Sequence, residues 1–132
     1  MDTVLVDTSV WINFFKGQET PSTILLKNNL TNFIIATCPV IIQEVLQGVL
    51  SDKEFKSVNT HFNSLVKFID DPYELAMDAA KLYREIRKKG FTIRKPNDCL
   101  IACYAIKNKV KLLHDDKDFT FIAQNSNLSI QL

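Results

Sequence analysis

Apolar residues in this chain fall into two patterns: short unbroken runs, and longer stretches in which they recur with helical spacing. The unbroken runs are typical of strands buried on both faces, and they occupy residues 3–7, 32–37, 66–69 and 111–113. Residues 128–132 could add an edge strand. Because helical stretches separate these runs, the pattern predicts an α/β sandwich with a central, mainly parallel sheet of four to five strands.

The stretches with helical spacing are bounded by residues that start or stop helices. Each of the four prolines opens one, and Gly17 and Gly90 end two of them. The expected helices cover residues 9–16, 21–29 and 52–65, with others starting at Pro39, Pro72 and Pro96 and a short last one that Asp118 could cap. Nothing in the chain resembles a linker or a repeat, so we expect residues 1–132 to form a single domain.

The composition excludes two broad classes of protein. With 132 residues, of which 46% are hydrophobic and 23% charged, the chain can bury a core, which excludes wholesale disorder. Sixteen basic and fifteen acidic residues leave a net charge of +1, which excludes a protein that coats nucleic acid by bulk attraction. A polyanionic substrate would therefore require a local basic patch or metal ions.

The cysteines and the N-terminus indicate the compartment. Cys38, Cys99 and Cys103 cannot all pair, which is typical of free thiols in a reducing environment. The first residues lack a basic segment and include Asp2 and Asp7, unlike a signal peptide, and the longest uncharged run (residues 28–43) is too short to span a bilayer. We expect a soluble cytoplasmic protein with no membrane partner.

Four acidic residues fall at the ends of expected elements. Asp7 ends the first strand, Asp116 follows the strand at 111–113, Glu44 lies in the second turn of the helix from Pro39, and Asp98 lies in the first turn of the helix from Pro96. Ligands of open α/β sheets bind beyond the carboxyl ends of the strands, so these four side chains could meet in one crevice. Singly, each also has an ordinary structural role as a helix cap, a first-turn acid or a turn residue.

A cluster of four carboxylates is stable when divalent cations neutralise it or when some members are protonated. An all-oxygen ligand set favours Mg²⁺ or Mn²⁺ over zinc. Such ions activate water and stabilise charge on a phosphodiester under attack. The cluster therefore predicts metal-assisted hydrolysis of a phosphate ester.

Four motifs in the chain resemble those of PIN-domain ribonucleases, in the same order. They are VDTSVWINFF at residues 6–15, QEVLQG at 43–48, TIRKPNDCLIACYAI at 92–106 and LLHDDKDFTFIA at 112–123. Together they span nearly the whole chain, and its small size is most similar to the VapC toxins of type II toxin–antitoxin systems. The resemblance implies a three-layer α/β/α PIN-like sandwich.

The resemblance also implies an activity, a cofactor and partners. It implies a Mg²⁺- or Mn²⁺-dependent endoribonuclease that cleaves tRNA or rRNA, is inhibited by a cognate VapB-like antitoxin and forms a homodimer. By position, Asp7, Glu44, Asp98 and Asp116 become the catalytic and metal-binding quartet. Ser9 falls where the family often has a small polar residue that orients a ligand or water, and Asp118 fills a secondary acidic position.

Other residues near the motifs have both functional and structural interpretations. His114 stands where many relatives have Thr or Ser; it could contact substrate, although a capping role is the simpler interpretation. Basic residues precede Asp98, and they are either a solvated face or candidates for binding RNA phosphates: Arg87, Lys88, Lys89, Arg94 and Lys95.

Two further functional classes stay open from the residues alone. The chain could be a non-catalytic PIN-like module that binds an antitoxin or RNA. Alternatively, it could transfer phosphoryl groups through an aspartate, although VDTSV lacks the DxD pair of such phosphatases. Cys99 and Cys103 share a helix face without a zinc-binding pattern, and Trp11 and His61 are expected to be structural.

Overall fold

A computed structural model describes residues 1–132, and its centre is a parallel sheet of four strands. The strands are β1 (Asp2–Val6), β2 (Phe33–Thr37), β3 (Val66–Lys67) and β4 (Lys111–Leu113), in the order β3-β2-β1-β4. The predicted α/β class and the mainly parallel sheet are confirmed. β3 is shorter than the predicted run at 66–69 because β2, its only neighbour, ends at Thr37 opposite Lys67.

The expected edge strand at 128–132 is reduced to a single bridge. Ile130 pairs in parallel with Leu112, and the amide of Gln131 donates to the Leu112 carbonyl at 2.8 Å. β4 has only three residues, and Leu112 is the one that pairs on this side. The C-terminal segment therefore covers the edge of β4 without extending the sheet to a fifth strand.

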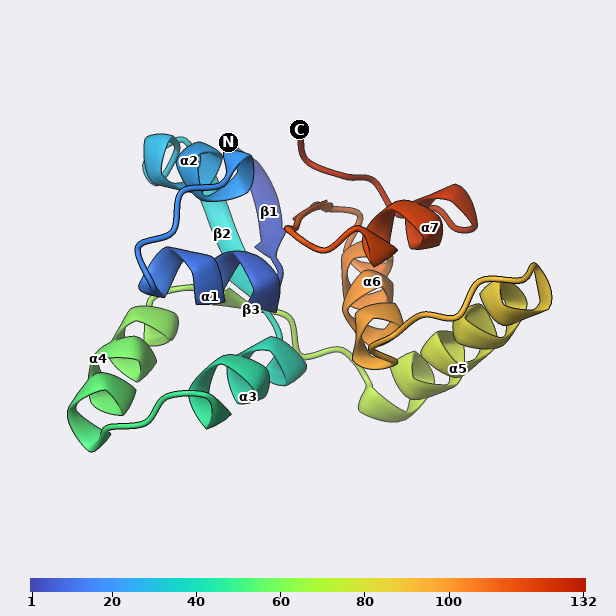
Figure 1. The fold of residues 1–132 in the computed structure, drawn as a ribbon, viewed down its shortest axis with the longest axis horizontal. Coiled ribbons are helices and arrows are strands. Elements are labelled where there is room, and N and C mark those ends of the chain that lie inside the picture. Colours follow the sequence, from blue (N-terminus) through green and yellow to red (C-terminus); the bar gives the residue numbers. More distant parts are fainter.

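Seven helices lie on both sides of the sheet, with α1 and α2 on one side of β1 and α6 and α7 on the other (Figure 1). They are α1 (Thr8–Phe15), α2 (Pro21–Asn28), α3 (Pro39–Gln47), α4 (Asp52–Asn63), α5 (Pro72–Lys88), α6 (Asn97–Lys107) and α7 (Asp118–Gln124). Asp118 does not cap the last helix as expected: Lys117 holds the cap position and Asp118 lies in the first turn.

The core between the sheet and these helices is built from β1 and from large aromatic side chains. Val4, Leu5 and Val6 are buried, as a strand with helices on both faces requires. Trp11 is fully buried, and its ring lies 5.2 Å from Phe62 and 5.3 Å from His61. The structural interpretation of Trp11 and His61 is therefore confirmed.

Helix α6 is the most deeply embedded of the helices and carries one of the candidate acids. Seven of its eleven residues are buried, among them Asp98, Cys99 and Cys103, because it packs against α3, α5, α7 and β4. All three cysteines are free and buried, as expected for small side chains in a core. No helix combines the length and the apolar character that crossing a bilayer requires.

Candidate active site

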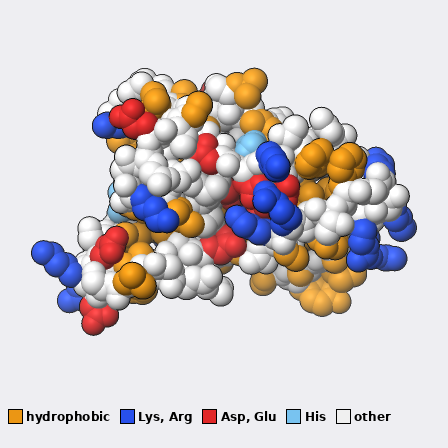
Figure 2. Space-filling view, viewed as in Figure 1, with side chains coloured by type: hydrophobic (Ala, Val, Ile, Leu, Met, Phe, Trp, Pro, Cys, Tyr) orange, Lys and Arg blue, Asp and Glu red, His pale blue; other side chains and the backbone are white.

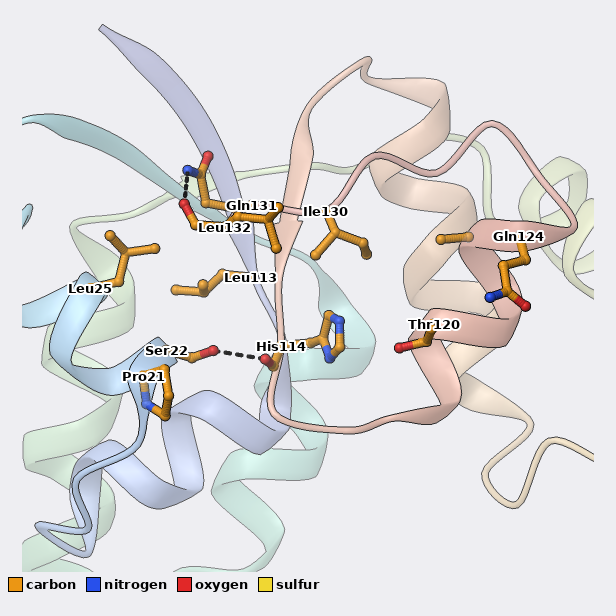
Figure 3. A pocket seen from close by; sticks show the side chains of 11 residues that line it. Pro21, Ser22, Leu25, Leu113, His114, Thr120, Gln124, Ile130, Gln131 and Leu132 are labelled. Atoms are coloured by element: carbon orange, nitrogen blue, oxygen red, sulfur yellow. Dashed lines mark hydrogen bonds between the residues drawn. The ribbon is translucent and has the colours of Figure 1, made fainter.

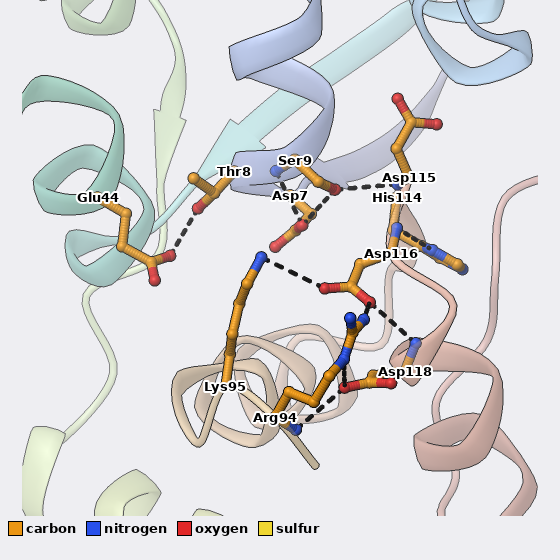
Figure 4. A network of polar contacts seen from close by, with 10 residues as sticks. All are labelled: Asp7, Thr8, Ser9, Glu44, Arg94, Lys95, His114, Asp115, Asp116 and Asp118. Carbon is orange, nitrogen blue, oxygen red and sulfur yellow. Dashed lines mark hydrogen bonds and ion pairs between the residues drawn. The ribbon is translucent and has the colours of Figure 1, made fainter. Parts of the chain in front are cut away.

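The carboxyl ends of β1 and β4 bring two of the predicted acids together. Asp7 follows β1 and Asp116 follows β4, and the two strands are parallel neighbours. The amide of Asp7 donates to the Leu113 carbonyl at 2.9 Å, which holds the two strand ends in register. Asp98 joins them from the first turn of α6. Figure 4 shows the network of polar contacts at this edge of the sheet.

Asp7 is buried, and its two carboxylate oxygens differ in their hydrogen bonding. Oδ2 accepts hydrogen bonds from the Ser9 amide at 3.0 Å and the Ser9 hydroxyl at 2.6 Å, so Asp7 also caps α1. Oδ1 is buried without a hydrogen-bond partner. Burial raises the pKa of Asp7 to about 6, against the lowering effect of the Ser9 hydrogen bonds.

Asp98 is the least compensated acid in the structure. Its residue is 3% exposed and its Oδ2 has no hydrogen-bond partner. Burial and then the negative charges of Asp7 and Asp116 raise the pKa of Asp98 to about 8. Without a bound cation, the carboxyl of Asp98 therefore holds a proton at neutral pH.

Asp116 is compensated by hydrogen bonds and cations. Its Oδ1 accepts from the Asp118 amide at 3.0 Å and from Arg94 Nη2 at 3.1 Å, and Lys95 Nζ lies 3.5 Å from its Oδ2. Burial acts to raise the pKa of Asp116, but the Asp118 amide and the cations of Lys95 and Arg94 together hold that pKa below its usual value.

The tightest group of acids is Asp98, Asp116 and Asp118, which offer one oxygen each within 4.8 Å of one another. Asp118 is buried, and its Oδ2 accepts from Arg94 Nε at 3.2 Å. The sequence suggests only a supporting position for Asp118. Asp118 lies two residues after Asp116, at the start of α7, and this spacing is the sequence signal that favours binding of one ion by both acids. Buried oxygens without partners, on Asp7 and Asp98, fit a hard divalent cation.

Glu44 lies beside this group and does not belong to its tightest part. It is half-buried on α3, and its Oε1 accepts from the Thr8 hydroxyl at 2.6 Å. Its charge contributes to the raised pKa values of both Asp7 and Asp98, so it faces the same region. Thr8, which orients Glu44, was not singled out by the sequence analysis, although it adjoins Asp7 in the first motif.

Ser9 and His114 connect the acids to the loop after β4. The Ser9 hydroxyl donates to Asp7 and accepts from the Asp115 amide at 2.9 Å. His114 is half-buried; its Nδ1 accepts from the Asp116 amide at 3.2 Å and its ring packs 5.1 Å from Phe119. Burial lowers the pKa of His114, so its imidazole is neutral at pH 7.

A cavity of about 680 Å³ lies beside His114 (Figure 3). It is lined by α2, β4, α7 and the C-terminal segment, with Leu25, Leu113 and Ile130 among its apolar residues. No Asp or Glu side chain lines it, so His114 is the only predicted site residue that it shares with the acidic cluster.

The five basic candidates divide into two groups. Arg94 and Lys95 form ion pairs with Asp116, and Arg94 also pairs with Asp118. Arg87 lies 5.6 Å from the ring of Tyr83, Lys89 donates to Asn125 at 2.8 Å, and Lys88 is exposed at the end of α5. The structure therefore places only Arg94 and Lys95 at the acidic cluster.

A parallel sheet with acids gathered after β1, after β4 and at the start of α6 defines the class of an open α/β domain with an acidic site at the carboxyl edge of its sheet. The PIN domain family model matches residues 4–125. Ribonuclease VapC11 of Mycobacterium tuberculosis is 34% identical over 128 residues, covering 95% of this chain and 95% of the relative. The chain therefore belongs to the PIN domain family, in its group of VapC ribonucleases.

Solved structures support the same fold. VapBC2 from Rickettsia felis, bound to a DNA fragment from its promoter, matches with a TM-score of 0.74 at 18% identity, covering 98% of this chain and 97% of that chain. VapBC-1 from nontypeable Haemophilus influenzae also matches with a TM-score of 0.74 at 18% identity, covering 98% and 96%. The PIN-like fold expected from the motifs is thus confirmed.

Proposed function

We propose that this chain is a Mg²⁺- or Mn²⁺-dependent endoribonuclease toxin that hydrolyses RNA phosphodiester bonds. The observation that carries the proposal is the convergence of acids from β1, α6 and the loop after β4, with one buried oxygen each of Asp7 and Asp98 left without a partner. Such a cluster costs folding free energy unless a cation binds there. The presence of this cluster in a chain of the PIN domain family supports metal-dependent chemistry.

In this proposal, Asp98, Asp116 and Asp118 would hold a divalent ion through one oxygen each, and Asp7 and Glu44 would complete the acidic site. A bound Mg²⁺ or Mn²⁺ supplies an acidified water and neutralises charge at the phosphate. The surrounding hydroxyls keep the carboxylates in place: Ser9 orients Asp7, and Thr8 orients Glu44. This preorganisation lowers the cost of binding the reacting groups.

His114 is proposed to contact the substrate. Because its Nδ1 accepts from the Asp116 amide, the neutral ring carries its proton on Nε2. That N–H faces away from the Asp116 amide and can donate to a group of the RNA.

The partners are part of the same proposal. A VapB-like antitoxin would restrain the toxin in the cytoplasm, and this is supported by the structural neighbours, which are VapBC complexes. We also propose a homodimer and a tRNA or rRNA substrate, in keeping with the family resemblance of the four motifs.

The test is cleavage of total RNA by the purified chain. We expect cleavage with Mg²⁺ or Mn²⁺ and none with EDTA. Asp7→Asn should abolish cleavage while the fold is kept, since Asn also caps helices. Asp78→Asn, which removes an exposed carboxylate on α5, is the matched control and should cleave as the wild type does.

Cleavage that survives EDTA, or full activity of Asp7→Asn, would contradict the proposal. Binding of RNA without cleavage under every metal condition would favour the non-catalytic module instead.

A further inference from the structure

We propose that Arg94 and Lys95 are a phosphate-binding pair that the acidic cluster holds until a divalent ion displaces it. The inference rests on the proposed function and adds a coupling between metal binding and RNA binding. The two residues lie in the segment before α6, and Figure 2 shows Lys and Arg side chains against a group of acidic side chains in the middle of one face.

The two cations already pair with Asp116, an acid that a divalent ion would need as a ligand. Arg94 Nη2 lies 3.1 Å from Asp116 Oδ1, and Lys95 Nζ lies 3.5 Å from Asp116 Oδ2. Both oxygens of Asp116 are thereby paired with a cationic group. A divalent ion that binds Asp116 must displace at least one of them, since positive charges repel at such distances.

A divalent ion can displace Arg94 and Lys95 because their own side chains are exposed and only the acids that they contact are buried. The side chains of Arg94 and Lys95 are 61% and 62% exposed, whereas those of Asp116 and Asp118 are 7% and 6% exposed. Arg94 and Lys95 stay solvated when they leave Asp116, and an incoming divalent ion would compensate the charge of the buried carboxylate in their place. The backbone amide of Arg94 also donates to Asp118 Oδ2 at 3.1 Å, so the segment has an anchor that does not depend on the guanidinium.

Each cation that is released remains next to the ion and is free to bind an anion. Arginine binds phosphate oxygens through two parallel N–H groups, and lysine binds them as a point charge. The ligand class is therefore the phosphate backbone of RNA at the scissile position. By thermodynamic linkage, the metal and the RNA must then each strengthen binding of the other.

The first arm of the test measures Mn²⁺ binding by isothermal titration calorimetry in the absence of RNA. Lys95→Met removes one competing cation, so we expect Mn²⁺ to bind about twofold to fivefold more tightly than to the wild type, the effect of losing one partly exposed ion pair. Lys81→Met is the matched control, because Lys81 is exposed on α5 and makes no ion pair in the structure. It should leave Mn²⁺ affinity unchanged.

The second arm measures binding of a fluorescein-labelled oligouridylate by fluorescence anisotropy, in EDTA and in Ca²⁺. The wild type should bind the oligouridylate more tightly in Ca²⁺. Lys95→Met should lose most of that increase, although it binds the metal more tightly. One substitution thus changes the two affinities in opposite directions, which loss of structure would not do. Thermal unfolding of each variant checks the fold.

The inference is overturned if Lys95→Met binds Mn²⁺ no more tightly than Lys81→Met does, or if Ca²⁺ strengthens RNA binding equally in both variants. The Mn²⁺ titration contains no RNA and needs no turnover, so it distinguishes the two proposals. A chain that cleaves RNA with Mn²⁺ but shows no change in Lys95→Met would refute the coupling alone.

Discussion

At the scale of single residues, Asp98 illustrates what burying an acid costs a folded chain. A carboxylate that is 3% exposed, with one oxygen unpartnered and two other acids nearby, destabilises a folded domain. An amide or apolar side chain would avoid that cost. Its position in the first turn of α6 favours an acid through the helix dipole, but that effect is small beside the cost of burial.

The cost predicts a pH dependence of stability in EDTA. The folded pKa of Asp98 is about 8, above its unfolded value, so the folded state holds a proton that the unfolded state has lost. The stabilising contribution of the protonated Asp98 to the free energy of unfolding is therefore fully present below about pH 4 and is lost as the pH rises toward about 8. Asp98→Asn cannot ionise and should show a flatter pH profile and higher stability than the wild type at the alkaline end.

Urea unfolding at several pH values between these limits measures the effect. Asp78→Asn, an exposed acid on α5, should keep the wild-type slope. Parallel profiles for Asp98→Asn and the wild type would show that Asp98 is not protonated in the folded protein.

At the scale of elements, the sequence predicted those segments whose signals are local. The buried runs of β1 and β4 and the prolines at the starts of α2, α3 and α5 suffice to place these elements. The length of β3 and the bridge at Ile130 depend on which strand lies alongside, which no local signal carries.

The same reasoning applies to the candidate site. The four acids Asp7, Glu44, Asp98 and Asp116 were predicted because each falls at the end of an expected element, and such ends can meet at the carboxyl edge of a parallel sheet. The family resemblance gave Asp118 only a secondary position, and its closeness to Asp98 depends on how α7 packs against α6, which no local signal carries. The contact of Arg94 with Asp118 spans 24 residues of sequence and depends on the path of the loop between α5 and α6.

The packing of α4 gives a prediction at this scale. Phe62 is 1% exposed and lies against Trp11 of α1, so it fixes α4 to the core. Phe62→Ala should lower the free energy of unfolding by about 3–5 kcal/mol, the usual cost of truncating a buried phenylalanine. Phe55→Ala, on the same helix but 43% exposed, should cost less than about 1 kcal/mol.

Urea unfolding of both variants checks the prediction, and equal losses would show that α4 is not held through Phe62.

At the scale of the whole molecule, the net charge of +1 conceals an uneven distribution. Two of the sixteen basic side chains, Arg94 and Lys95, are paired with acids at the edge of the sheet. Others gather at the C-terminal end of α5, which lies at the far side of the molecule from β1 (Figure 1). A charge total cannot distinguish these two regions, because only the fold assigns each cation its neighbours.

This division predicts the salt dependence of RNA binding. Each phosphate of a single-stranded RNA that a protein cation neutralises contributes about −0.7 to the slope of log K against log salt concentration. Only Arg94 and Lys95 lie at the site, so a short oligouridylate in Ca²⁺ should give a slope of about −1.4. A slope near about −3.5 would instead show that Arg87, Lys88 and Lys89 also contact phosphates. Anisotropy titrations over a range of salt concentrations measure the slope, and Lys88→Met, as the control, should leave it unchanged.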